Sequence, residues 1–201
     1  IRDPEMSRGL GDVYKRQNYD RAIQKCQKAI QRHSIKQRPE WNKSRRKTAK
    51  DIEWLNRREY NPFIWKAWML MGRSQFYQGD FENAASTFAY MSRLFETQPA
   101  IYGRAKAWLA KCYIEQNWMY DAEDIIRNMQ RDSIHWRAQK EWDYTYTDYY
   151  IHTQQFDKAI PYLRKVIKHE MRRKQKAREW YLMGQLQAAL GRKTEAYKAF
   201  K

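Results

Sequence analysis

Residues 65–88 read WKAWMLMGRSQFYQGDFENAASTF and contain a pattern that the chain repeats near its end. Gly72 and Gly79 are followed by Ala84 and Phe88. Residues 177–200, AREWYLMGQLQAALGRKTEAYKAF, have the same order. The equivalent residues are Trp68 and Trp180, Met71 and Met183, Gly72 and Gly184, Gly79 and Gly191, Ala84 and Ala196, and Phe88 and Phe200. The pattern predicts two helices that pack closely at the small residues and are joined by a turn at the second glycine.

The alanine of this pattern recurs along the chain, at Ala22, Ala84, Ala122, Ala159 and Ala196. Its successive spacings are 62, 38, 37 and 37 residues. The last three lie just above the roughly 34 residues of a tetratricopeptide unit, whose order of Trp, Leu-Gly, Ala and Phe the pattern resembles. We therefore predict an all-α fold, namely a right-handed α-solenoid of tetratricopeptide-like helix pairs.

The spacings also predict the organisation of the chain. Residues 61–201 are expected to form about four tetratricopeptide-like repeats, the last of them truncated, and residues 18–33 a leading half-repeat equivalent to the second helix of a pair. The long first spacing falls on residues 34–60, a basic insertion in which residues 48–59 predict a short helix that buries Ile52 and Leu55. Residues 1–17 resemble a translated sequencing adapter and are expected to be a non-native tail.

Two helix starts can be predicted from capping residues. Asn61 followed by Pro62 is typical of an N-cap and the first residue of a helix, which here is the first helix of the complete repeats. Asp80 is expected to cap the second helix of that pair, because its carboxylate can accept a hydrogen bond from a free backbone N–H.

Composition excludes several classes of protein. The 201 residues include 40 Lys and Arg against 23 Asp and Glu, a net charge of +17. No apolar stretch approaches the ~18 residues of a transmembrane helix. The only cysteines, Cys26 and Cys112, are too few for a disulfide framework and are expected to be buried thiols.

No pattern indicates catalysis. The four histidines are scattered, and no nucleophile motif, phosphate-binding loop or metal-ligand spacing is present. Asp121, Glu123 and Asp124 cluster, but acidic residues also favour the first turn of a helix, which is the simpler interpretation. We expect no enzyme activity, no catalytic or metal site and no cofactor.

Two longer stretches carry a family resemblance. They are residues 59–91, EYNPFIWKAWMLMGRSQFYQGDFENAASTFAYM, and residues 157–192, DKAIPYLRKVIKHEMRRKQKAREWYLMGQLQAALGR. They resemble the tetratricopeptide lipoproteins linked to type IX secretion and gliding motility in Bacteroidota. The resemblance implies an outer-membrane lipoprotein on the periplasmic side of the bacterial envelope. Cys26 lies within a helical pattern and cannot be the lipidated cysteine.

The first helices of the repeats supply the candidate binding residues. In a superhelix of helix pairs, one stripe of each first helix lines the concave face. The predicted partner-binding residues on these stripes are Lys66, Arg73, Phe76, Arg104, Lys111, Tyr144, Arg178 and Tyr181. A basic and aromatic groove predicts a noncatalytic scaffold that binds an acidic protein segment with apolar anchors.

The alternative is RNA or DNA binding by the basic surface. Residues 45–47, 57–58 and 172–174 are runs of Arg and Lys that could contact phosphates. Trp68, Trp108 and Trp180 would have to be exposed to stack on bases, whereas the repeat pattern places them in the packed interior. Protein binding is therefore the preferred function.

Overall fold

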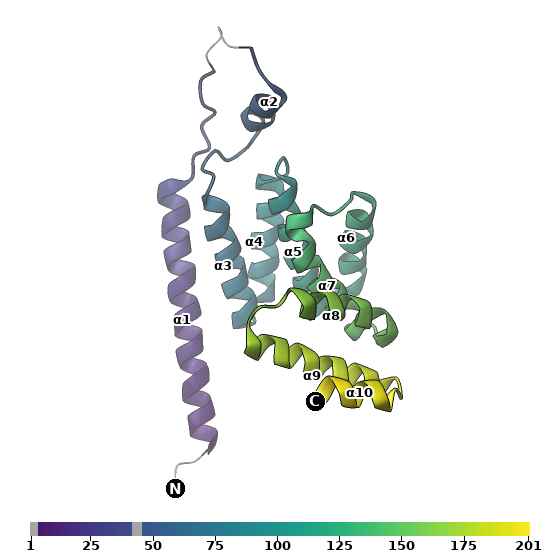
Figure 1. Cartoon of the computed structure of the whole chain (residues 1–201). Helices are drawn as coiled ribbons and strands as arrows, with labels where there is room; N and C mark the ends of the chain where they lie inside the picture. Colours follow the sequence, from purple (N-terminus) through teal and green to yellow (C-terminus); the bar gives the residue numbers. More distant parts are fainter. Residues whose placement is uncertain (1–3, 42–45) are drawn as a thin grey trace. The chain divides into compact units, whose positions relative to one another are not determined.

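The computed structural model describes residues 4–41 and 46–201, with side chains from residue 16 onward, and this part of the chain is helical without a strand (Figure 1). The all-α prediction is confirmed. The helices are α1 (Pro4–His33), α2 (Ala49–Leu55), α3 (Ile64–Gln78), α4 (Phe81–Leu94), α5 (Pro99–Glu115), α6 (Met119–Arg131), α7 (Gln139–His152), α8 (Phe156–His169), α9 (Arg173–Ala189) and α10 (Lys193–Phe200), with a 3-10 turn, η1, at Trp136–Ala138.

The chain divides into two compact units, Ile1–Cys112 and Tyr113–Lys201, and the boundary falls within α5. In the first unit, α3 packs against both α1 and α4. In the second unit, α8 packs against α7 and α9, and α9 packs against α10. The buried centre of the second unit is apolar and comes from α8, α9 and α10: Ala159, Ile160, Leu163, Val166, Ile167, Met183, Leu186 and Ala199.

One turn recurs between helices along the chain. Gly79, Asn117, Gln154 and Gly191 have positive φ angles, of 86°, 60°, 57° and 73°. Their spacings of 38, 37 and 37 residues equal those of the recurring alanines. After each of them, the next backbone N–H donates to the carbonyl five residues earlier at 2.8–3.0 Å, which closes the end of the preceding helix. The chain is therefore a structural repeat, including the two middle turns, where glycine is absent.

The recurring alanine lies five residues after each of these turns. Ala84, Ala122 and Ala159 are fully buried, and Ala196 is 5% exposed. Asp80 accepts a hydrogen bond from the backbone N–H of Asn83 at 3.3 Å, so the predicted cap of α4 is confirmed.

Gly72 and Gly184 bring the two helices of their pairs together. A Cβ atom at Gly72 would lie 2.7 Å from Phe88 Cζ, and one at Gly184 would lie 2.5 Å from Phe200 Cε1. Both distances are shorter than carbon–carbon contact, so each phenylalanine ring packs directly on a glycine. Each contact joins residues 16 apart, as expected from the repeated pattern.

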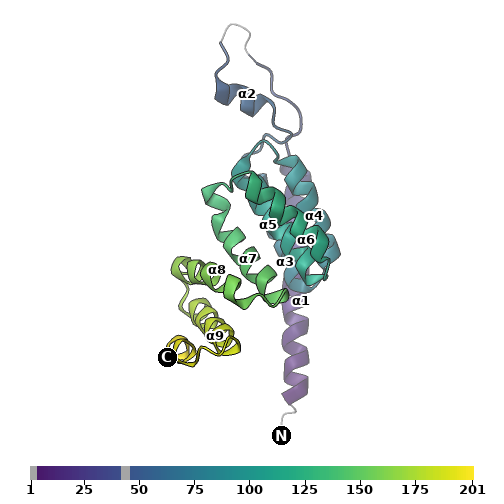
Figure 2. The same ribbon diagram turned by 90° about the vertical axis from the view of Figure 1, so that its right-hand side faces the viewer.

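The insertion after α1 is closed at its base by Glu59, which is 1% exposed. Its carboxylate accepts hydrogen bonds from the backbone N–H of Ile35 at 2.8 Å and of Asn61 at 2.9 Å, and from the Ser34 hydroxyl. The backbone N–H of Tyr60 also donates to the Ile35 carbonyl at 2.9 Å. The two ends of the insertion therefore meet, and α2 lies beyond the ends of α1 and α3 in both views of the ribbon (Figures 1 and 2).

Three local predictions need correction. The short helix exists as α2 and buries Leu55, but Ile52 is 48% exposed. Asn61 does not cap α3, which begins at Ile64; its side chain instead accepts from the Phe63 N–H at 2.9 Å and forms a turn before the helix. Trp180 is 42% exposed, so it does not lie in the packed interior.

The predicted boundary after Gln17 falls inside α1, which continues from Pro4 to His33 and packs against α3. Asp20 of α1 accepts a hydrogen bond from Gln78 Nε2 at 2.7 Å, and Cys26 is 5% exposed. The source of residues 1–17 and the remaining domain boundaries stay predictions. Residues 42–45 of the predicted insertion lie outside the described part.

Gly72→Ala should destabilise the protein more than Gly184→Ala. Phe88 is fully buried and its ring stacks on Trp108 at 5.8 Å, so it cannot move away from a methyl group. Phe200 is 49% exposed and can turn outward. We expect Gly72→Ala to lower the free energy of unfolding in urea by about 1–3 kcal/mol, the usual cost of overpacking. An equal or larger loss in Gly184→Ala would contradict this packing.

Gln154→Gly should stabilise the protein, and Gly79→Gln should destabilise it by about 1 kcal/mol, because a Cβ atom disfavours the left-handed region. Neither change fills space: a Cβ at Gly79 would meet no atom within 4 Å. Gln155→Gly is the control, since Gln155 has φ −91° and should lose stability on becoming glycine. Thermal unfolding of the three variants would test the order, and a destabilised Gln154→Gly would contradict it.

Candidate functional site

Five of the predicted binding residues lie in the first unit, on α3 and α5. Lys66, Arg73 and Phe76 come from α3, and Arg104 and Lys111 come from α5. With Trp65 and Trp108, they form a group of cations and aromatic rings that we call the α3–α5 cluster.

Trp108 is the centre of one half of the cluster. Its ring lies 5.2 Å from Arg73 Cζ and 5.1 Å from Lys111 Nζ, both within the distance of a cation–π interaction. Phe76 packs edge-on against the same ring at 5.4 Å, and Lys111 Nζ lies 5.9 Å from the Phe76 ring. Trp108 is only 7% exposed, so a packed ring holds the two cations in place.

Trp65 is the centre of the other half. Arg104 Cζ lies 5.6 Å and Lys66 Nζ 6.0 Å from its ring. Lys66 Nζ also lies 5.3 Å from the ring of Phe63, which is 68% exposed. The prediction omitted Trp65 and Phe63. Trp65 stands next to Lys66 in the sequence and Phe63 three residues before it, and this proximity was the available signal.

The cations of the cluster lie against aromatic rings, which restrict the movement of their side chains. Lys66 and Arg73 are exposed, and neither forms an ion pair with a carboxylate among the residues that the structure describes. Cations that rest on aromatic rings lose less conformational freedom when an anion binds them. This arrangement can therefore bind a carboxylate or phosphate group next to an apolar contact.

Tyr144 lies in the second unit and makes internal contacts. Its hydroxyl lies 2.5 Å from Glu179 Oε1 and 3.3 Å from Glu170 Oε2, and both glutamates are 4% exposed. Burial, together with these carboxylates, raises the pKa of the Tyr144 hydroxyl above its ordinary value. The tyrosine therefore keeps its proton and donates a hydrogen bond to a buried carboxylate.

Glu170 has further partners. The backbone N–H of Arg172 donates to Glu170 Oε1 at 2.9 Å and holds the pKa of Glu170 below its ordinary value. Lys140 Nζ lies 3.6 Å from Glu170 Oε2. This network joins α7 to the beginning of α9, so the Tyr144 hydroxyl has a structural role within the unit.

Arg178 and Tyr181 lie on α9 of the second unit and are exposed. The Tyr181 ring packs on Phe200 at 5.4 Å. The structure thus brings together Lys66, Arg73, Phe76, Arg104 and Lys111, and it places the other three predicted residues in a separate unit.

Exposed aromatic residues of the second unit were not predicted as site residues. Tyr120 is 90%, Trp136 71% and Trp118 50% exposed. Arg137 Cζ lies 4.9 Å from the Trp136 ring. Their signal in the sequence was weak, because no repeat position distinguishes an exposed aromatic residue from a buried one.

The acidic residues at the start of α6 have partners along their own helix. Glu123 forms an ion pair with Arg127 at 2.7 Å, and Asp124 accepts a hydrogen bond from Asn128 at 3.1 Å. No group of three His, Cys, Asp or Glu side chains suited to a metal occurs among the described residues. Both cysteines are buried, as predicted, and burial raises the pKa of the Cys26 thiol.

Comparison with known proteins identifies no relative. No protein-family model matches the chain, and no curated protein matches it. Among the described residues, no helix is both long and apolar enough to cross a membrane. We therefore infer the function from the chain's own residues.

Tyr144→Phe should destabilise the second unit by about 1–3 kcal/mol, because it leaves a buried carboxylate without its hydroxyl donor. Tyr181→Phe is the matched control: Tyr181 is 59% exposed, and its variant should unfold like the parent protein. Urea unfolding at neutral pH measures both. Equal stability of the two variants would show that the Tyr144 hydroxyl has no structural role.

Proposed function

We propose that the protein is a noncatalytic scaffold that binds another protein through the α3–α5 cluster. The observation that carries this proposal is that two cations, Arg73 and Lys111, lie about 5 Å from the ring of Trp108. Arg73 is exposed and forms no ion pair among the described residues, so it is open to a carboxylate of a bound segment. The partner is then an acidic segment with one or two apolar anchors beside Phe76.

The same proposal includes the finer architecture. We infer a right-handed α-solenoid of tetratricopeptide-like pairs, supported by the four equivalent turns and by the glycine–phenylalanine contacts at Gly72 and Gly184. In such an array, the first helix of each pair lines the binding face. The position of the cluster on α3 and α5, the first helices of two successive pairs, agrees with this arrangement.

For the cellular role, we propose an envelope secretion or gliding-motility assembly, with the protein attached to the outer membrane as a periplasmic lipoprotein. The support is the resemblance of residues 59–91 and 157–192 to the lipoproteins of those assemblies. Fractionation of the native bacterium, with immunodetection of the protein, would test this placement. Recovery in the cytoplasm would contradict it.

RNA or DNA binding is the second candidate function. The observation that favours it is Trp136, which is 71% exposed and has Arg137 4.9 Å from its ring. An exposed ring beside a cation can stack on a base while the cation binds a phosphate. Trp136 lies in the second unit, so variants of the first unit distinguish this function from the first.

Reversing two charges of the cluster should weaken binding of an acidic peptide. The probe is a fluorescent peptide of about 12 residues with Asp and Glu around two Phe residues, and fluorescence anisotropy measures its Kd. Arg73→Glu with Lys111→Glu should weaken binding at least about tenfold, since both charges then repel the peptide. Arg164→Glu with Lys168→Glu, on exposed positions of α8, is the control with the same net charge and should change the Kd less than about twofold.

Arg73→Ala alone is a second variant in case the double reversal does not fold, and a smaller loss of affinity is expected. A single-stranded oligonucleotide is the competing ligand. Tighter binding of the oligonucleotide with a steep salt dependence, unchanged in the cluster variant and lost in Trp136→Ala, would overturn the protein-binding proposal in favour of nucleic-acid binding.

A further inference from the structure

A second surface of the first unit has the properties of a helix-binding groove. α1 and α3 together line an open groove of about 580 Å³. It shares only Lys66 with the α3–α5 cluster. Its other lining residues do not belong to that cluster.

The apolar part of the groove consists of small side chains and one exposed leucine. Ala22 and Ala29 from α1 and Ala67 from α3 are half-buried and line the groove with Leu70, which is 52% exposed. Small residues allow another helix to approach to the 8–10 Å typical of packed helices. Leu70 offers an apolar contact to such a helix, and the removal of its side chain from water would favour binding.

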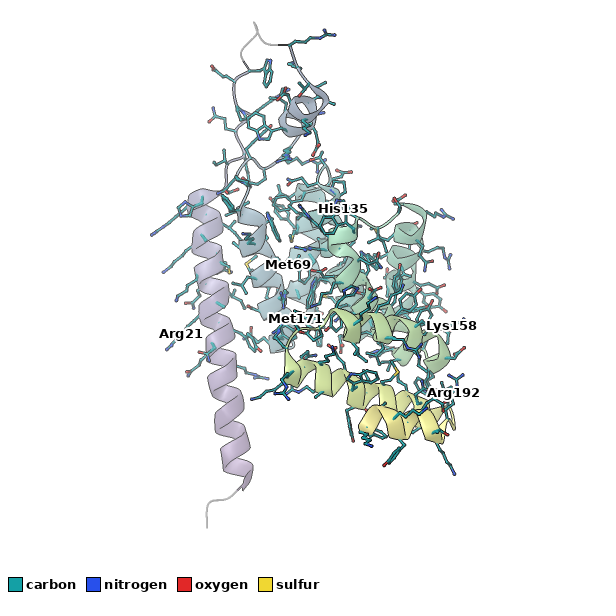
Figure 3. The ribbon with its side chains drawn as sticks, in the orientation of Figure 1. Arg21, Met69, His135, Lys158, Met171 and Arg192 are labelled. Atoms are coloured by element: carbon teal, nitrogen blue, oxygen red, sulfur yellow. The ribbon has the colours of Figure 1, made fainter. Side chains whose placement is uncertain are left out.

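The charged part of the groove is entirely basic. Arg21 and Lys25 from α1 and Lys66 from α3 are exposed, and no Asp or Glu among the described residues lines the groove. Arg21 and Lys25 form no hydrogen bond or ion pair within the described part of the chain. Figure 3 shows Arg21 on α1, in the helix that flanks α3. The charge of this surface is complementary to an acidic partner.

The geometry along α1 indicates the form of the partner. The lining residues of α1 run from Asn18 to Ala29, which at ~1.5 Å per residue is about 17 Å, or three helical turns. Grooves formed by two neighbouring helices bind amphipathic helices by their apolar face, with anchors three, four and seven residues apart. We propose that the α1–α3 groove binds an acidic amphipathic helix of a partner protein, with its apolar face on Leu70 and the alanines.

A designed peptide tests this proposal. The probe is a fluorescein-labelled helix of about 14 residues with Leu at positions i, i+4, i+7 and i+11 and Glu at the flanking positions. A matched peptide carries Lys in place of Glu. Anisotropy titration with the full chain should show binding of the acidic peptide only.

Two pairs of charge reversals on α1 locate the site. Arg21→Glu with Lys25→Glu should weaken binding of the acidic peptide at least about tenfold, because both residues line the groove. Lys28→Glu with Arg32→Glu is the matched control: both residues are exposed on the same helix, have the same four-residue spacing and lie outside the groove lining. The Kd of this control variant for the acidic peptide should change less than about twofold. Leu70→Glu should weaken binding like the first pair.

Several outcomes would overturn the proposal. Equal weakening by the two charge-reversed pairs would show that only net charge matters. Concentration-dependent dimerisation of the parent in sedimentation experiments, lost in Leu70→Glu, would identify a second copy of the chain as the occupant. Arg21→Gln with Lys25→Gln repeats the test if the reversed pair is unfolded by circular dichroism. Unchanged peptide binding in a folded variant of this pair would also overturn the proposal.

Binding at the α1–α3 groove can be measured separately from binding at the α3–α5 cluster. Arg73→Glu with Lys111→Glu changes no residue of the α1–α3 groove lining, so it should leave the Kd of the helical peptide unchanged. If that variant lost binding of both the Phe-containing acidic peptide and the helical acidic peptide, the groove would not be a second site.

Discussion

The left-handed turn between the two helices of a pair is the constraint on which the repeat depends. At Gly79, Asn117, Gln154 and Gly191, the chain adopts positive φ, and the following N–H donates back to the carbonyl five residues earlier. This fixes where one helix ends and in which direction the next begins. The buried alanine five residues later then lies where the second helix crosses the first. The end of the first helix and the start of the second are thus set by one local conformation.

Close helix contact follows from that turn. Gly72 and Gly184 lie seven residues before a turn, and Phe88 and Phe200 lie nine residues after it, so each ring meets the glycine of its own pair. The same contact has different surroundings in the two places. Phe88 is enclosed and stacks on Trp108, whereas Phe200 is half exposed. Burial of the ring therefore depends on the neighbouring helices and not on the contact with glycine.

The charged residues serve both packing and surface functions. In the second unit, buried Glu170 and Glu179 receive hydrogen bonds and an ion pair, so their carboxylates stabilise the contact between α7 and α9. In the first unit, Arg73 and Lys66 remain on the surface against aromatic rings. Exposed cations without an ion pair among the described residues, Arg73 and Lys66 here and Arg21 and Lys25 on α1, are the basis of both binding proposals.

The order of small and aromatic residues was enough to predict helices, their pairing and the repeat spacing, because these depend on contacts between residues close in sequence. It also identified the Asp80 cap and five residues that meet on α3 and α5. The sequence did not reveal the turns at Asn117 and Gln154, since their side chains are not those that favour positive φ most strongly.

The internal role of Tyr144 and the closure of the insertion by Glu59 were also beyond sequence reasoning. Both depend on partners about 25–35 residues away, and no local pattern indicates which of several acidic residues will be buried. The exposure of Trp180 has the same origin: a tryptophan at a repeat position is buried only when another element covers it. Local order therefore determined the helices and turns, while burial and polar partners were set by contacts between distant segments.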